Sequence, residues 1–380
     1  MKKSYKFRIY PNNKQKRLIE KTFGCCRFIY NYFLDKRIKL YEIDKQSISD
    51  YDMIREITQL KKQYLWLKIP PIDALQQVVL DLCSAYNNFF RRVRNGENPG
   101  FPKFKSKKNS KKSYREYYSK VDFENSTIQL LKVKKVKIRG LRKFEGKISQ
   151  VTVSKTPTNK YYVNILVEDN NGFPVKICDP LKTVIGIDLG IKNFMTLSDN
   201  RKFILPSQKE NYKVLDILQY RSSKKQKGSK NKEKAYLKVA KQYEKIANIK
   251  KDFLHKLSHQ LTHENQVKTI VVEDLNVQGM VKNRCLAKSI HQSSWSEFIR
   301  QLKYKSDWYG LNFIQIGRFE PTSKTCSNCG CINKNLTLSD RTWTCNKCHT
   351  ILDRDINAAI NIRNTGLGRP SELVEMSSSN

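Results

Sequence analysis

The chain has 380 residues, and its 73 lysine and arginine residues outnumber its 35 aspartate and glutamate residues, for a net charge of +38 at pH 7. A surface this positive repels itself and attracts polyanions, so nucleic acid is the expected partner. No run of ~18 apolar residues and no signal-peptide core occurs, which argues against a membrane span and a membrane partner. The length allows two or three domains, and we expect an α+β multidomain protein.

The N-terminal half combines strand-like and helical segments. Residues 5–10, YKFRIY, alternate apolar and polar side chains as a half-buried strand does, and β-rich runs return within residues 116–180. Between them, apolar residues recur at helical spacing, most clearly in residues 72–90. We therefore predict a β-barrel-like domain of residues 1–11 and 116–180 that is interrupted by a helical insertion, residues 12–115.

The end of this insertion is strongly basic. Residues 101–115 contain seven basic residues, three aromatic residues and no acidic residue. A solvated charged surface is one interpretation, but aromatic rings between lysines also suit base stacking beside phosphate contacts. We expect nucleic-acid contacts from this stretch, and the candidate residues are Lys103, Lys105, Lys107 and Lys108.

A second pattern begins near residue 181. Three strand-like runs are followed by helical sequence, and then by two further strand-like runs with helical sequence after each. This strand–strand–strand–helix–strand–helix–strand–helix order is that of an RNase H-like (RuvC) α/β domain. We assign that domain to residues 181–321 and 350–365, and we expect the polar tail, residues 366–380, to be disordered.

A cysteine-rich segment separates the two parts of this domain. Cys326-x2-Cys329 and Cys345-x2-Cys348 are fifteen residues apart, a spacing typical of a four-thiolate zinc site. Four thiolates complete a tetrahedral coordination shell and leave no position for water. We therefore expect a structural zinc ribbon in residues 322–349.

One further cysteine, Cys331, could compete as a ligand, although its spacing is less suitable. The other five cysteines are scattered among apolar or mixed sequence, where free thiols are common. Because no secretory signal is present, this usage predicts a reducing cytoplasm as the location.

Three acidic residues of the α/β pattern lie at the end of a predicted strand or near the start of the last predicted helix. Asp188 ends the strand-like run VIGID, Glu273 ends TIVVE, and Asp355 lies near the start of the final helix. Carboxylates that meet in one pocket repel one another unless cations are bound, and Mg²⁺ prefers oxygen ligands. We therefore predict a catalytic site that holds two Mg²⁺ ions and hydrolyses phosphodiester bonds.

Two neighbouring acidic residues could take the place of Glu273 or Asp355 in the predicted site. Asp274 follows Glu273 but, by strand alternation, points to the opposite face. Asp353 lies two residues before Asp355, and we expect it to cap the helix instead. Each acid taken alone could be an ordinary surface or capping residue. Their combination on this fold pattern favours the metal site.

Several longer motifs resemble the TnpB proteins of bacterial insertion sequences. They include YKFRIYPNNKQKRLIEKTFGCCRFIYNYFL, GFPKFKSKK, GIDLGIKNFMTLSD, VVEDLNVQGM, PTSKTCSNCG and DRDINAAINI, and the similarity runs from about residue 3 to residue 363. The resemblance implies an RNA-guided DNA endonuclease related to type V CRISPR effectors. Such a protein carries a guide RNA from the transposon end, reads a short motif beside its target, and cuts both strands of double-stranded DNA.

The family motifs G-[IV]-D-x-G, [VE]-x-E-[DN]-L and D-x-N-A-A map onto Asp188, Glu273 and Asp355. The resemblance also implies that the N-terminal region holds RNA and reads the adjacent motif, which makes Gln76 and Gln77 candidate contacts. It places the protein in a bacterial or archaeal cell, close to the nucleoid. One chain on one RNA is expected, with a dimer as the alternative.

The chain departs from the family pattern at the second cysteine pair. His349 stands where the family has glycine and Leu352 where it has histidine, which leaves any auxiliary role of that histidine open.

Other functions are alternatives to the one that this resemblance implies. A DDE transposase would place two aspartates before a glutamate, unlike the order found here. The remaining alternative is a non-catalytic RNA- or DNA-binding regulator of transposition. His255, His259 and His263 share one helical face, and we prefer a polar or DNA-facing stripe to a metal site there.

Overall fold

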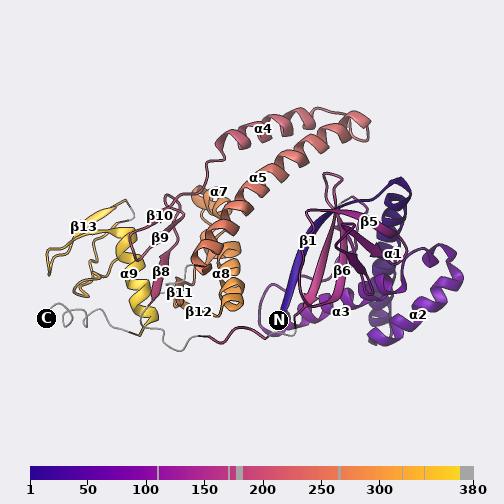
Figure 1. The fold of residues 1–380 in the computed structure, drawn as a ribbon, viewed down its shortest axis with the longest axis horizontal. Coiled ribbons are helices and arrows are strands. Elements are labelled where there is room, and N and C mark those ends of the chain that lie inside the picture. The colour runs from indigo at the N-terminus through magenta and orange to yellow at the C-terminus, as the bar shows by residue number, and fades with distance from the viewer. Residues whose placement is uncertain are drawn as a thin grey trace. The chain divides into compact units, whose positions relative to one another are not determined.

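The computed structural model describes residues 1–108, 111–169, 172–176, 183–263, 267–318, 320–337 and 339–368. They fall into two compact units, Met1–Gly172 and Phe173–Asn380, each with its own hydrophobic core (Figure 1). Among these residues, none of the helices combines the length and the apolar character that crossing a membrane requires. Most of the tail that we predicted to be disordered, from residue 369 on, lies outside the described residues.

The first unit is built on a seven-stranded antiparallel sheet in the order β2-β6-β7-β1-β5-β4-β3. Its strands are β1 (Lys2–Tyr10), β2 (Lys112–Glu116), β3 (Lys120–Asp122), β4 (Thr127–Leu130), β5 (Lys134–Arg139), β6 (Lys147–Lys155) and β7 (Tyr161–Glu168). β1 lies between β7 and β5, so the strand predicted at residues 5–10 does join the later strands. Residues 117–119 alone join the edge strands β2 and β3, so the sheet must curve until its edges approach each other.

Helices pack on this sheet and share its core. They are α1 (Asn13–Asp44), α2 (Asp50–Gln63), the short 3-10 helix η1 (Leu65–Lys68) and α3 (Ile72–Arg94). The ring of Phe23 in α1 lies 5.8 Å from the ring of Tyr114 in β2, centre to centre. β2 begins at Lys112, so the sheet resumes slightly before the boundary predicted at residue 116.

The second unit contains a five-stranded sheet in the order β10-β9-β8-β11-β12. β8, β11 and β12 are parallel, whereas β9 is antiparallel to both β8 and β10. The elements follow one another in the predicted order. They are β8 (Val184–Asp188), β9 (Met195–Leu197), β10 (Lys202–Phe203), α4 (Lys209–Ser223), α5 (Lys230–His263), β11 (Thr269–Glu273), α6 (Val277–Met280), α7 (Arg284–Ser293), α8 (Trp295–Tyr309), β12 (Asn312–Ile316), β13 (Thr342–Thr344), β14 (Ile351–Asp353) and α9 (Arg354–Gly366).

Helices cover both faces of the five-stranded sheet. Alternate residues of β11 show how: Ile270 and Val272 pack in the core formed with α5 and α8, whereas Val271 packs with α9. On β8, Gly186 faces α9, and a Cβ atom there would collide with the carbonyl oxygen of Ala359. The backbones of β8 and α9 are therefore in direct contact, which places the start of α9 beside the ends of β8 and β11.

Candidate functional site

The three predicted acids lie at one edge of the five-stranded sheet. Asp188 is the last residue of β8, and Glu273 is the last residue of β11. Because the two parallel strands pair Ile187 with Val272, the acids that follow extend side by side. Strand alternation turns both toward the face that α9 covers, and Asp355 lies in the first turn of α9.

The charges of Asp355 and Glu273 act on Asp188. The pKa of the Asp188 carboxyl is raised to about 7, first by burial and then by the charges of Asp355 and Glu273. Burial also raises the pKa of Glu273, with a contribution from Asp274. A bound cation would relieve both the repulsion and the lost hydration, and three carboxylates fit the oxygen preference of Mg²⁺. The charges of Asp355 and Glu273 thus reach the Asp188 carboxyl, although the oxygens of the three acids are not grouped as tightly as the sulfurs of the cysteine cluster.

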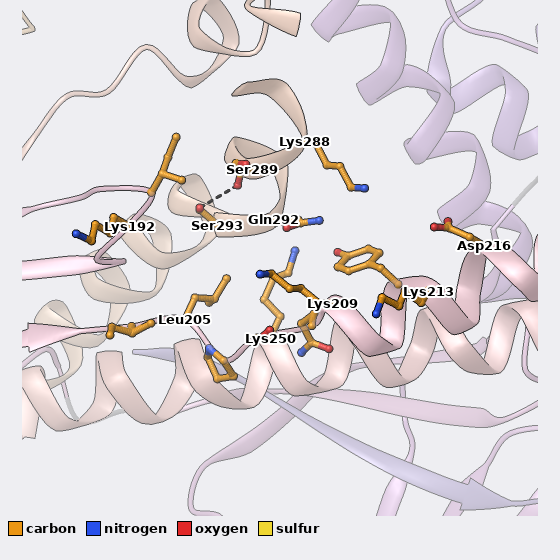
Figure 2. A pocket seen from close by; sticks show the side chains of 16 residues that line it. Lys192, Leu205, Lys209, Lys213, Asp216, Lys250, Lys288, Ser289, Gln292 and Ser293 are labelled. Atoms are coloured by element: carbon orange, nitrogen blue, oxygen red, sulfur yellow. Dashed lines mark hydrogen bonds between the residues drawn. The ribbon is translucent and has the colours of Figure 1, made fainter. Parts of the chain in front are cut away.

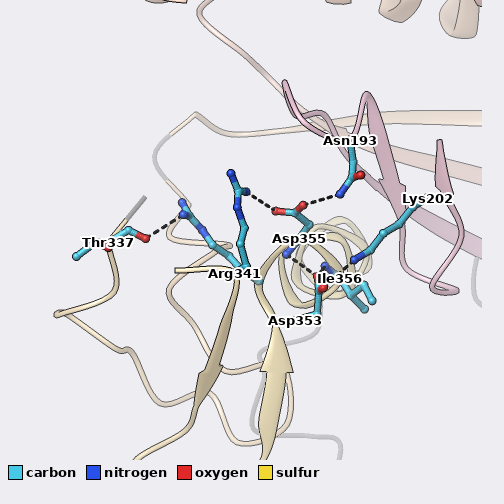
Figure 3. Close-up of polar contacts among 8 residues, drawn as sticks. Asn193, Lys202, Thr337, Arg341, Asp353, Asp355 and Ile356 are labelled. Carbon is cyan, nitrogen blue, oxygen red and sulfur yellow. Dashed lines mark hydrogen bonds and ion pairs between the residues drawn. The ribbon is translucent and has the colours of Figure 1, made fainter. Parts of the chain in front are cut away.

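Asp355 is held from two sides (Figure 3). Asn193, in the turn between β8 and β9, donates a hydrogen bond from Nδ2 to Oδ2 of Asp355 at 3.1 Å. Arg341, just before β13, places a guanidinium nitrogen 3.7 Å from the other carboxylate oxygen. We did not predict either residue from the sequence. For Asn193 a signal existed, because it follows Asp188 within the same glycine-containing turn, GIKN.

Asp353 caps the helix, as predicted. Its Oδ1 accepts hydrogen bonds from the backbone N–H groups of Asp355 and Ile356 at 3.1 and 3.0 Å. Its other oxygen forms an ion pair with Lys202 at 2.7 Å (Figure 3). These bonds occupy the Asp353 carboxylate and fix the first turn of α9, which carries Asp355.

Asp274 has partners of its own. Its carboxylate accepts hydrogen bonds from Nε2 of Gln315, at 2.9 Å, and from Nε of Arg318. Gln315 belongs to β12 and Arg318 follows that strand. The side chain is therefore engaged by residues in and after β12, although its charge still raises the pKa of Glu273.

The four predicted zinc ligands form one cluster. The Sγ atoms of Cys326, Cys329, Cys345 and Cys348 all lie within 4.8 Å of one another. The Sγ atoms of Cys326 and Cys348 are 3.6 Å apart, and those of Cys329 and Cys345 are 3.5 Å apart. A zinc tetrahedron with Zn–S bonds of about 2.3 Å has edges of roughly 3.8 Å. The cluster therefore fits a structural zinc ribbon.

The two halves of the ribbon are built alike. In each half, the residue after the second cysteine donates its N–H to the carbonyl oxygen of the first, Gly330 to Cys326 and His349 to Cys345, both at 2.9 Å. Both donors have left-handed backbones, with φ of 72° at Gly330 and 56° at His349. Cys331 stands outside the sulfur cluster, and its carbonyl oxygen accepts a hydrogen bond from the Cys326 N–H at 2.8 Å. The scattered cysteines within the described residues are free, as predicted: Cys25, Cys26, Cys83 and Cys285.

Two asparagines of α9 attach the ribbon to the helix. Asn357 is buried; its Nδ2 donates to the Thr325 carbonyl oxygen at 2.7 Å, and its Oδ1 accepts from the Ser327 N–H at 2.8 Å. Asn361, one turn later, donates to the carbonyl oxygens of Thr322 and Thr325 at 2.7 and 2.6 Å. The backbone around the first cysteine pair is thus bonded directly to the helix that carries the third acid. The i, i+4 spacing of the two asparagines was a usable signal that we did not interpret.

The predicted lysine contacts differ in exposure. Lys103, Lys107 and Lys108 are exposed, as an electrostatic contact requires. Lys105 is half-buried, with its Nζ 3.7 Å from the centre of the Tyr30 ring, and burial lowers its pKa. Lys105 therefore takes part in the packing of the first unit as well as adding to its positive charge.

The two predicted glutamines lie on α3. Gln76 is half-buried, whereas Gln77 is buried, and the Gln77 Oε1 accepts a hydrogen bond from Nε2 of Gln150 at 3.4 Å. Gln77 lines a cavity of about 440 Å³ within the first unit, and most of the other polar groups around it are basic. They include Arg27, Lys105, Lys107, Lys111, Lys112 and Arg115. A concave basic surface with an amide in its wall is compatible with the predicted nucleic-acid contact.

The histidine stripe shows no metal-site geometry. The rings of His259 and His263 are in contact, 5.0 Å between centres, and Tyr309 packs against both. Within the described ranges, the cysteine cluster is the one group of potential ligands close enough to hold an ion.

Three family models match successive parts of the chain. A helix-turn-helix domain model of the IS605 OrfB group matches residues 1–46, and the OrfB family itself, described as a probable transposase, matches residues 178–284. The Cas12f1-like TNB domain matches residues 295–362, which include the cysteine cluster.

Individual relatives cover nearly the whole chain. A protein of Streptomyces pristinaespiralis, provisionally named RNA-guided DNA endonuclease, is 35% identical over 373 residues, which are 97% of this chain and 90% of the relative. The chain belongs to the TnpB family. A second member, InsQ of Escherichia coli (strain K12), has the same provisional name and is 31% identical over 96% of this chain and 92% of its own length.

The fold of this TnpB-family chain also resembles solved structures. The Cas12f1 protein in a cryo-EM structure with sgRNA and target DNA superposes with a TM-score of 0.58 at 15% identity, covering 96% of this chain and 99% of that one. The mini-RNA-guided endonuclease CRISPR-Cas phi3 gives a TM-score of 0.50 at 10% identity, covering 98% and 93%. At these identities the likeness concerns the fold. It confirms a mixed α/β, multidomain architecture for the TnpB-family chain.

Proposed function

We propose that this protein is an RNA-guided DNA endonuclease in which Asp188, Glu273 and Asp355 hold Mg²⁺ and serve phosphodiester hydrolysis. The two relatives provisionally named for this activity and the net charge of +38 support the function. One observation carries the assignment of the site. Asp188, Glu273 and Asp355 converge from two strand ends and a helix start, and the pKa of Asp188 is raised to about 7 by burial and by the other two acids.

The sheet topology supports an RNase H-like (RuvC) domain formed by residues 181–321 and 350–365. Its antiparallel β10-β9-β8 portion continues into the parallel strands β11 and β12, with the acids at the first strand, the fourth strand and the last helix. The ribbon, residues 322–349, would be an insertion before that helix. In the first unit, the curvature required by the short β2–β3 connection supports the predicted barrel-like domain, although its strand β2 begins before the predicted boundary at residue 116 and the unit ends at Gly172.

When bound, two Mg²⁺ ions would supply an activated water and stabilise the leaving oxygen. The chain's own contribution is to hold the acids in place. Asp188 and Glu273 are fixed by paired strands, while Asn193 and Arg341 orient the Asp355 carboxylate. In the protein alone, burial and repulsion disfavour the ionised form of Asp188, so cation binding and proton release at this residue are coupled.

The nucleic-acid partners follow from family membership. We expect a guide RNA from the transposon end and a double-stranded DNA target that carries a short adjacent motif, with one chain per RNA. Gln76, Gln77 and the basic stretch of residues 101–115 are the candidates for reading that motif. Gln77 and much of the basic stretch line the cavity of the first unit, which supports this role for them.

Cleavage of a matched plasmid tests the proposal. RNA that co-purifies with the protein is sequenced to identify the guide, and the complex is then given its target with Mg²⁺ or with EDTA. We expect double-strand cleavage that requires Mg²⁺ and is abolished in Asp188→Ala, while target binding is retained. Asp274→Asn is the matched control and should retain most of the cleavage, because that acid is engaged on the β12 side. Target binding without cleavage by the parent would favour a non-catalytic regulator of transposition.

A further inference from the structure

Basic residues outside the acid site surround a cavity in the second unit. The cavity has a volume of about 790 Å³ and is bounded by the turn after β8, the segment before α4, and helices α4, α5 and α7. Among its lining residues, Asp216 is the one acid, and it lies at the opposite end from Lys192 (Figure 2). Lysines from four separate segments line this space, which we call the lysine cavity: Lys192, Lys209, Lys213, Lys250 and Lys288.

The positive charge of the lysine cavity is largely unbalanced. Lys213 forms an exposed ion pair with Glu210 at 3.0 Å, and the other four lysines form no ion pair within the part of the chain that the structure describes. Lys250 is half-buried, and its Nζ donates to the His291 carbonyl oxygen at 3.3 Å. Burial lowers the pKa of Lys250. An anion in the cavity would stabilise the charged form of this lysine.

The wall of the cavity also includes the N-terminus of α4. This helix begins at Lys209 without a side-chain cap, because Gln208 at the cap position accepts a hydrogen bond from the Asn211 side chain instead. Free N–H groups and the helix dipole at such an end attract anions. Tyr212 lies among the lysines, with its ring centre 6.0 Å from Nζ of Lys288. Lysines beside an aromatic ring are the combination that single-stranded nucleic-acid sites use.

The lysine cavity begins next to the acid site. Lys192 immediately precedes Asn193, whose side chain donates to Asp355 at 3.1 Å. Ile191 also lines the cavity and follows Asp188 by three residues, so their Cα atoms are at most about 11 Å apart. A nucleic-acid strand bound in the cavity could therefore extend directly to the carboxylates.

We propose that the lysine cavity binds the phosphate backbone of a single-stranded DNA segment, offers Tyr212 to one base, and leads the strand to Asp188, Glu273 and Asp355. This inference rests on the proposed function, because it takes DNA as the molecule that is cut. The cavity volume lies within the range of ligand pockets, about 300–1,000 Å³. A base reaches an aromatic ring in a cavity wall only when it is unpaired, which is why the segment is single-stranded.

Binding of an oligothymidylate of about 16 nucleotides tests the cavity without requiring cleavage. Affinity for single strands falls with salt with a slope of about −0.7 per neutralised phosphate, so loss of three cavity lysines should reduce the slope by about 2. A control that removes three exposed α5 lysines outside the cavity should change the slope much less. Equal slopes for the two triple variants would overturn the proposal. The cavity triple is Lys209→Ala, Lys250→Ala and Lys288→Ala, and the control is Lys234→Ala, Lys238→Ala and Lys245→Ala.

Tyr212 provides an independent test of the stacking contact. Tyr212→Phe retains the ring and should bind the oligonucleotide like the parent, whereas Tyr212→Ala should bind about 5- to 150-fold more weakly. The conservative variant guards against a loss of binding caused by misfolding, because it preserves the packing of α4. Equal binding by the alanine and phenylalanine variants would contradict the role of the ring.

Photo-cross-linking in the guided complex identifies which strand occupies the cavity. Thiothymidine is placed in the target DNA or thiouridine in the RNA, and cross-linked peptides of α4 and α7 are mapped. Cross-links from DNA are expected, and cross-links from RNA alone would overturn the proposal. If the parent complex binds but does not cut its target, the proposed function fails, while the oligonucleotide measurements still decide whether the cavity binds a DNA strand.

Discussion

Gly186 of β8 lies so close to Ala359 of α9 that a single added methyl group would overlap the Ala359 carbonyl oxygen. β8 ends in Asp188 and the first turn of α9 contains Asp355. The contact between the two backbones therefore controls how closely these two acids approach. Neither a strand nor a helix backbone can move away here without disturbing its own hydrogen bonds, so this packing of α9 on β8 requires glycine at residue 186.

Replacing Gly186 should therefore destabilise the second unit. We expect Gly186→Ala to lower the free energy of unfolding by about 1–3 kcal/mol, the cost typical of overpacking. Urea unfolding followed by tryptophan fluorescence measures this, because Trp295, Trp308 and Trp343 belong to the second unit. Gly24→Ala in α1 is the matched control: no atom lies within 4 Å of its added Cβ, and the change should stabilise that helix by about 0.5–1 kcal/mol. A Gly186→Ala protein as stable as the parent would show that α9 does not pack this closely on β8.

The raised pKa of Asp188 predicts a pH-dependent stability of the metal-free protein. Its folded-state pKa, about 7, lies above the ordinary value of 3.8, so the folded protein is most stable with this carboxyl protonated. That stability is lost as the pH rises from about 4 to about 7. Asp188→Asn removes the dependence, and in EDTA at pH 8 it should be more stable than the parent by up to about 4 kcal/mol.

Thermal unfolding of the parent and of Asp188→Asn in EDTA measures this difference at pH 8 and near pH 5.5. The extra stability of Asp188→Asn should be smaller at pH 5.5. Adding Mg²⁺ at pH 8 should stabilise the parent more than the variant, because the variant lacks one of the three ligands that we propose. Asp274→Asn is the control: it removes the charge that acts on Glu273 but weakens the bonds to Gln315 and Arg318, so it should stabilise far less than Asp188→Asn at pH 8. An Asp188→Asn protein that is less stable than the parent at pH 8 would argue against repulsion among the acids.

The places of the acids in their strands and helix, and the grouping of the cysteines, could be predicted because their signals are local. A carboxylate at the end of a strand, or two cysteines two residues apart, can be recognised without knowing the fold. Asn193 and Asp355 are 162 residues apart in the sequence, so their hydrogen bond follows only from the packing of α9 on the sheet. The lysine cavity could not be predicted from the sequence for the same reason, since its lysines are spread over residues 192–288 without a common period.

The attachment of the ribbon through Asn357 predicts a link between α9 and zinc retention. Asn357→Ala would leave the buried Ser327 N–H without this partner, at a cost of about 1–3 kcal/mol, whereas the Thr325 carbonyl oxygen keeps its hydrogen bond from Asn361. We expect faster transfer of zinc to a chromogenic chelator and weaker DNA cleavage. Asn333→Ala, which removes an exposed hydrogen bond from the Asn335 N–H, should change the transfer rate little. Equal transfer rates for the two variants would mean that the ribbon holds its metal independently of α9.

His349 is a position where, unlike at Asn357, substitution should stabilise the ribbon. Its left-handed backbone, with φ of 56°, costs an ordinary residue about 1–2 kcal/mol. Its side chain is exposed. His349→Gly removes the strain and keeps the N–H that donates to Cys345. Glycine's greater freedom in the unfolded chain offsets about 0.5–1 kcal/mol of this gain.

The net expectation for His349→Gly is a ribbon more stable by up to about 1 kcal/mol, measured as up to about fivefold slower zinc transfer to the chelator. Gly330→Ala, at the equivalent position of the other cysteine pair, should accelerate transfer, because alanine there meets the strain that glycine avoids. One variant thus introduces glycine and the other removes it, at equivalent positions of the two cysteine pairs. Faster zinc loss from His349→Gly would show instead that the imidazole itself supports the ribbon, which would give this departure from the family pattern a function of its own.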